Sequence, residues 1–261
     1  MKQNDIGSKK LIMVFTIVGI ILFVAGMFFA VDWINFTYGH GNKFTSYAKA
    51  FTSLLCAIIA WVIGRDGVDK KDTALLGAAF FCIVSTDTIM NSVTVIQSRA
   101  SETVILKAFI AGAVLSIITH LILIIRHGRG FKWLSASESG RSLALTLSLP
   151  VFVYLVGGVS FVLLSPHLDE IELFYSGLFY TVFAATSLWI GWETVRNRLY
   201  PRLNACMIAL AMTLWFLAEI VVLISNIQIG TISTVCYNLT WLFYGPSILL
   251  LALSGYRWGG K

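Results

Sequence analysis

Two carboxylic acids, Asp87 and Glu219, lie deep inside long apolar runs of the chain. An ionisable side chain in hydrocarbon costs about 2.5–3.5 kcal/mol on insertion scales, so such residues mark pathways or catalytic sites by default. Helical geometry places Asp87 about 14 Å from the C-terminal end of its apolar run, and Glu219 about 10 Å from the C-terminal end of its own run. If the two carboxyls face one another, they can act as an acid and base pair.

Three further polar residues accompany the acids in apolar runs. Asn91 follows Asp87 by four residues and therefore shares its helical face. His120 fits either a hydrogen bond between helices or a catalytic role. Lys49 fits snorkelling to the interface, an anionic head group, or a pair with Asp87.

The last apolar run carries polar and aromatic residues at helical spacing. Tyr237, Asn238 and Tyr244 either line a pocket for a lipid head group or simply pack between helices. Asp32, near the end of the first run, is interpreted as solvated.

The composition defines the elements that must position these residues. Of 261 residues, 57% are hydrophobic and 12% are charged, and the mean hydropathy is +0.83. Soluble domains have about 45–50% apolar and about 25% charged residues, so a soluble enzyme, a disordered chain and a disulfide scaffold are excluded. An all-α, polytopic membrane protein remains.

Apolar runs of about 20 residues, the length that crosses a bilayer, occur eight times. They predict a single domain of eight transmembrane helices over residues 11–32, 46–64, 74–96, 103–126, 143–164, 171–193, 203–226 and 229–255.

Basic residues set the predicted orientation. With the N-terminus inside, 15 of the 19 Lys and Arg residues fall in cytoplasmic segments, which predicts that both termini are cytoplasmic. This pattern accounts for the net charge of +6 without nucleic-acid binding. We expect a multi-pass protein of a bacterial inner membrane rather than the endoplasmic reticulum.

Motifs for other chemistries are missing from the sequence. There is no zinc-type HExxH, no GxSxG elbow and no Walker sequence, and the four cysteines show no metal spacing. We therefore expect no metal and no cofactor, and any catalysis must use carboxyls, histidine, hydroxyls and water.

The order of the polar residues resembles the lysoplasmalogenase (YhhN-like) family of eight-span membrane proteins. The corresponding stretches are Lys49-Ala50, Thr86-Asp87, Thr119-His120, Ala218-Glu219 and Leu239-Thr240-Trp241. The chain departs from the family pattern, which has Pro after the lysine, Gly before the aspartate and the histidine, and Asp in place of Glu219.

The resemblance implies hydrolysis of the vinyl ether bond of a lysoplasmalogen, which yields a fatty aldehyde and a glycerophospho head group. Asp87 and Glu219 would then be the catalytic pair. Lys49 would neutralise the phosphate or tune Asp87, and His120 would orient water or a head group.

Two other functions fit the same residues. In a proton-coupled transporter of small molecules, Asp87 and Glu219 would form a proton relay. In a membrane sensor or binding protein, they would bind a ligand without turnover. The expected partner of the hydrolase is a membrane lipid or lysophospholipid, whereas the sequence leaves the oligomeric state open.

Overall fold

The computed structural model describes residues 2–38, 43–64, 66–96, 100–130, 143–167, 171–227 and 231–258. Within these ranges the chain forms eight α-helices and one short 3₁₀ turn, so the predicted all-α class is confirmed. The elements are α1 (Lys2–Tyr38), α2 (Lys43–Gly64), α3 (Lys70–Ile96), α4 (Glu102–His127), α5 (Leu143–Leu164), η2 (Ser165–His167), α6 (Ile171–Arg196), α7 (Arg202–Ile227) and α8 (Thr231–Leu253).

Each predicted span coincides with one helix. Six helices, α1 to α5 and α7, are long and apolar enough to cross a membrane. Helix α8 contributes a further apolar stretch, Asn238–Leu253, among the described residues. The fold is therefore that of a helical membrane protein with several spans.

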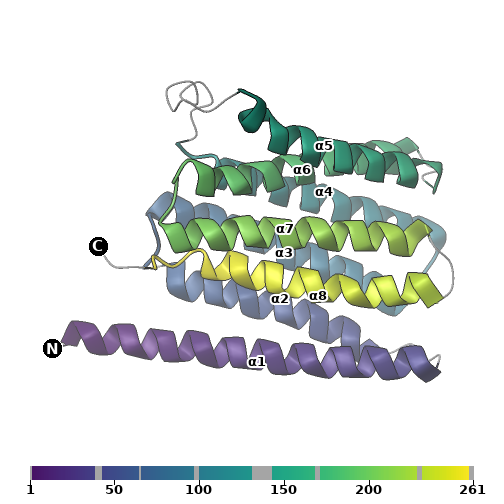
Figure 1. The fold of residues 1–261 in the computed structure, drawn as a ribbon. Coiled ribbons are helices and arrows are strands. Elements are labelled where there is room, and N and C mark those ends of the chain that lie inside the picture. The colour runs from purple at the N-terminus through teal and green to yellow at the C-terminus, as the bar shows by residue number, and fades with distance from the viewer. Residues whose placement is uncertain are drawn as a thin grey trace.

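Six of the helices form a closed ring. Helices α2, α3, α4, α6, α7 and α8 each contact the next, and α8 returns to α2. Helix α1 packs outside the ring against α2 and α8, and α5 packs against α6 and α7 on the opposite side (Figure 1). Both chain termini lie at the same end of the bundle (Figure 1).

Apolar side chains divide between the ring interior and its outer surface. On α3, Phe80 is 1% exposed whereas its neighbour Phe81 is 73% exposed. Large exposed residues such as Trp61 and Phe23 continue this apolar outer surface. A continuous exposed apolar surface is the pattern of a bundle that faces lipid.

A network of buried polar side chains joins the helices at the end where the termini lie. Asp72 of α3 and Arg126 of α4 form an ion pair with 2.8 Å between Oδ2 and Nη2, and both side chains are fully buried. Tyr200, in the α6–α7 loop, donates to Asp72 and to the backbone oxygen of Arg126. Arg126 also donates to Ser254, after α8. Arg126 is the last residue of the predicted span 103–126, and the structure buries its side chain completely.

Two groups at the edge of this network have shifted pKa values. A hydrogen bond from Arg129 lowers the pKa of the Asp69 carboxyl. Burial raises the pKa of the Tyr200 phenol to about 12, which keeps the phenol a hydrogen-bond donor even in mildly alkaline solution.

Candidate functional site

The Asp87 carboxyl lies in the interior of the six-helix ring and is 7% exposed. The Ser53 hydroxyl of α2 donates to its Oδ2. The Tyr244 hydroxyl of α8 lies 3.2 Å from Oδ1 and 3.0 Å from Oδ2. Hydroxyls from two neighbouring helices thus hold the carboxyl in place. Asn91 supports the same turn of α3, because its Nδ2 donates to the backbone oxygen of Asp87 at 2.7 Å.

The Glu219 carboxyl is held by aromatic side chains. Trp215, one turn earlier on α7, donates from Nε1 to Oε1 at 2.9 Å. The Tyr180 phenol of α6 lies close enough to Glu219 to interact with it electrostatically. The Trp215 ring lies against Tyr244, with 5.4 Å between their centroids. The aromatic side chains therefore connect the surroundings of Glu219 to those of Asp87.

The two carboxyls belong to one cluster. Asp87 and Glu219 interact electrostatically, and Tyr244 interacts with both. At roughly 1.5 Å per residue, Asp87 lies about 14 Å from the end of α3 at Ile96, and Glu219 lies about 12 Å from the end of α7 at Ile227. The structure thus brings the sequence-predicted acids together at mid-depth, and all six ring helices contribute to the cluster or its immediate surroundings.

His120 of α4 lies beside the cluster rather than on the carboxyls. Its Nδ1 is 2.9 Å from the Ser187 hydroxyl of α6. Its ring packs against Trp215 and Tyr180, with centroid separations of 5.0 and 5.5 Å. Its Nε2 is buried and has no hydrogen-bond partner among the described residues. His120 joins α4 to α6, as expected for a hydrogen bond between helices, and leaves one ring nitrogen uncommitted.

Lys49 forms an ion pair with Asp32 of α1, with 2.8 Å between Nζ and Oδ2. Its side chain is 3% exposed and that of Asp32 is 11% exposed. The Lys49 ammonium also lies over the rings of Phe28 and Trp241. The interpretation of Asp32 as a solvated boundary residue is therefore wrong, because Asp32 compensates a buried cation.

Two predicted residues of α8 remain, and three residues of the cluster were not predicted. Asn238 is half-buried on α8, and the side chain of Tyr237 lies outside the described residues. Ser53, Tyr180 and Trp215 were not predicted as site residues from the sequence. The four-residue spacing from Trp215 to Glu219 is a signal that could have found one of them.

Comparison with known proteins gives no match to a protein-family model, to a curated protein or to a solved structure. Function must therefore be inferred from the site itself.

In the part of the chain that the structure describes, no group of three His, Cys, Asp or Glu side chains could hold a metal ion. The cluster offers two coupled carboxyls, two phenols and one aliphatic hydroxyl, which are groups that store and transfer protons.

Proposed function

We propose that the chain crosses a membrane eight times, with both termini in the cytoplasm. Two structural observations support this topology, namely eight helices and termini at one end of the bundle. The sequence supports it as well, because 15 of the 19 basic residues fall in the segments predicted to be cytoplasmic. Helices α6 and α8 complete the six-helix ring. We therefore propose that they cross the membrane too, beside the candidate spans α1 to α5 and α7.

We propose that the protein is a membrane-embedded hydrolase of lysoplasmalogen-like lipids, which cleaves their vinyl ether bond. The observation that carries this proposal is the placement of Asp87, which is buried, and Glu219, which is half-buried, in one electrostatically coupled cluster. Vinyl ether hydrolysis requires a proton on carbon and then water on the resulting cation. A carboxylic acid and a carboxylate held together supply both functions.

The proposed reaction consumes one water molecule. The acid transfers its proton to the β-carbon of the vinyl ether and leaves an oxocarbenium ion at the carbon bonded to oxygen. The second carboxylate stabilises this cation and removes a proton from the attacking water. The hemiacetal that forms then breaks its bond to the glycerol oxygen, which takes up a proton. The products are a fatty aldehyde and the glycerophospho head group.

The depth of the residues fits such a substrate. Lys49 is about 9 Å from the start of α2 at Lys43, and Asp87 is about 14 Å from the end of α3. The phosphate and the ether carbon of a lysoplasmalogen are separated by a handful of bonds, so a phosphate near Lys49 would place the ether near the carboxyls. Lys49 must then exchange part of its contact with Asp32 for the phosphate.

Aldehyde release tests this proposal. The full-length protein is purified in detergent and incubated with lysoplasmenylethanolamine and lysoplasmenylcholine across a range of pH. Asp87→Asn and Glu219→Gln should each slow release by about 10²–10⁴-fold. Glu102→Gln is the matched control, because Glu102 is an exposed carboxyl in the first turn of α4.

Two outcomes would contradict the hydrolase. If folded wild-type protein releases no aldehyde under any of these conditions, the proposed substrate is wrong. If release survives unchanged in both carboxyl variants, the proposed pair is wrong. Proton-coupled flux in liposomes that requires Asp87 and Glu219, without product formation, would favour the transporter instead.

A further inference from the structure

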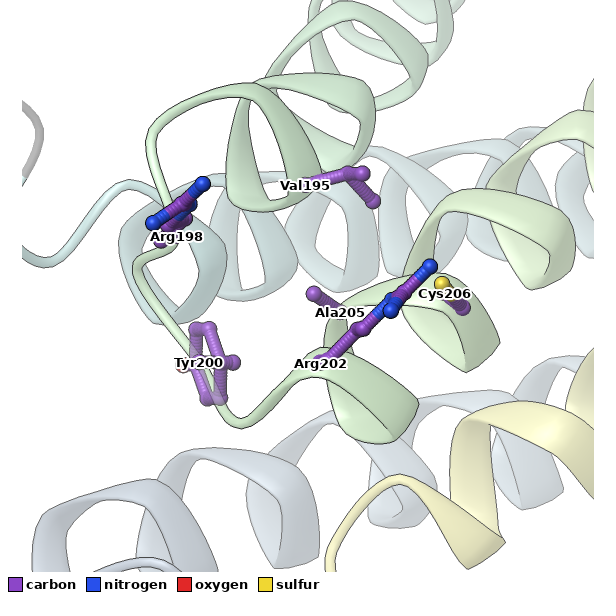
Figure 2. A pocket seen from close by; sticks show the side chains of 6 residues that line it. All are labelled: Val195, Arg198, Tyr200, Arg202, Ala205 and Cys206. Carbon is purple, nitrogen blue, oxygen red and sulfur yellow. The ribbon is translucent and has the colours of Figure 1, made fainter.

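A surface cavity of about 700 Å³ lies where α6 turns into α7. This volume falls within the range of sites that take small molecules or head groups. Figure 2 shows the side chains that line it: Val195, Arg198, Tyr200, Arg202, Ala205 and Cys206. The turn is at the end of the bundle where both termini lie (Figure 1).

The two arginines of this cavity differ from their basic neighbours. Arg196 pairs with Glu193 at 2.7 Å, and Arg129 pairs with Asp69 at 2.9 Å. Arg198 and Arg202 are exposed, and neither has an acidic partner within the described part of the chain. The cavity therefore holds two positive charges that no carboxylate of the described residues neutralises.

The backbone beneath Arg198 is unusual. Arg198 has a φ of 52°, in the left-handed region, and is the one non-glycine residue with positive φ among those described. The N–H groups of Arg198 and Leu199 donate to the oxygens of Val195 and Thr194, which is the pattern of a Schellman motif. Glycine is the usual residue at this position of the motif. An arginine here keeps a guanidinium at the cavity despite the steric cost to the backbone.

The wall of the cavity is fixed to the interior of the protein. Tyr200 is 6% exposed, and its hydroxyl donates to Asp72 at 2.8 Å and to the backbone oxygen of Arg126 at 2.7 Å. Ala205, on the first turn of α7, is 2% exposed. The loop that carries Arg198 and leads into Arg202 at the start of α7 is thus anchored to the buried ion pair, so the site is preorganised rather than a pair of free surface charges.

We propose that this cavity binds a phosphate group through Arg198 and Arg202. Guanidinium groups bind phosphate oxygens in a bidentate manner, and basic pockets between membrane helices take anionic lipid head groups. The site is separate from the carboxyl cluster. Arg202 and Glu219 are 17 residues apart on α7, or about 25 Å along the helix, which is too far for the phosphate and ether of one lysolipid. The ligand is a phosphate on an anionic phospholipid or free in solution.

Native mass spectrometry of the full-length protein, with equal phosphatidylglycerol and phosphatidylcholine in the micelle, tests the site. The wild type should retain phosphatidylglycerol preferentially. At about 1 kcal/mol per arginine, Arg198→Gln or Arg202→Gln should weaken retention about fivefold, and the double variant about thirtyfold. Arg257→Gln is the matched control, because Arg257 is an exposed arginine near the same end that does not line the cavity.

A second variant separates binding from folding. Arg198→Gly removes the charge and supplies the residue that the left-handed backbone favours, so its thermal midpoint should equal or exceed that of the wild type while retention falls. Inorganic phosphate is added in a parallel titration. If added phosphate displaces the lipid, the ligand is a soluble phosphate; if the lipid stays bound despite phosphate, the ligand is a lipid. Either result supports the site when it is seen in the wild type and is lost in the double variant. Equal lipid retention and equal phosphate response in the wild type and the double variant would overturn the proposal.

Discussion

The buried pair between Asp72 and Arg126 allows a sharp prediction about stability. Asp72→Asn keeps the shape of the side chain and removes its charge, so no cavity is created. The Arg126 guanidinium then stays fully buried and loses the carboxylate that contacts its Nε at 3.0 Å and its Nη2 at 2.8 Å. Breaking a buried ion pair from one side costs about 3–5 kcal/mol, because an uncompensated charge remains. We expect Asp72→Asn to lower the free energy of unfolding by this amount.

Asp69→Asn is the matched control for this prediction. The Asp69 side chain is half-exposed and pairs with Arg129. Its Oδ1 also accepts the backbone N–H of Asp72, a capping role at the start of α3 that asparagine fills equally well. The expected loss is therefore at most about 1 kcal/mol. Arg126→Met should fall between the two variants, because Asp72 keeps its contacts with Arg129 and Tyr200.

Unfolding by sodium dodecyl sulfate in mixed micelles measures these differences. Tryptophan fluorescence and far-ultraviolet circular dichroism should report one transition, which shifts strongly for Asp72→Asn and slightly for Asp69→Asn. If the two variants unfold within about 1 kcal/mol of each other, the reasoning about the buried charge fails.

Three further perturbations test other contacts. Tyr244→Phe removes the hydroxyl that donates to Asp87 and should lower the free energy of unfolding by about 1–3 kcal/mol; an unchanged value would refute the contact. Lys49→Met and Asp32→Leu should each destabilise the protein, whereas the double variant Lys49→Met, Asp32→Leu should recover most of the loss; simple addition of the two losses would contradict the pair. The raised pKa of Tyr200, about 12 against about 10 when unfolded, favours the neutral phenol in the folded state. Its stabilisation is therefore complete below about pH 10 and is lost as the pH rises towards 12, so Tyr200→Phe should lack this alkaline loss; a wild-type pH profile in that variant would refute the assignment.

The helices could be predicted from the sequence because their signal is local. A run of about 20 apolar residues identifies a helix without knowledge of its neighbours. The same holds for Asp87 and Glu219, since a carboxyl inside such a run is conspicuous wherever the helix packs. The ring arrangement has no such signal, because it depends on which helix faces meet.

Partners on other helices explain the errors. Asp32 looks solvated in sequence because it ends an apolar run, yet it meets Lys49, 17 residues later on α2. Ser53 is an ordinary serine until packing brings it to Asp87, 34 residues away. Arg126 has the sequence context of an interfacial charge and is buried because Asp72, on α3, neutralises it. Such pairings follow from helix order, which spacing along one helix does not give.

The central claim is that Asp87 and Glu219 act as one catalytic unit. A double-mutant cycle on aldehyde release tests it most directly, with Asp87→Asn, Glu219→Gln and the double variant assayed at equal folded concentration. Members of one catalytic unit are strongly non-additive, so the double variant should be about as slow as the slower single variant. If the two losses multiply as for independent sites, or if the wild type releases no aldehyde, the account of the carboxyl pair is contradicted.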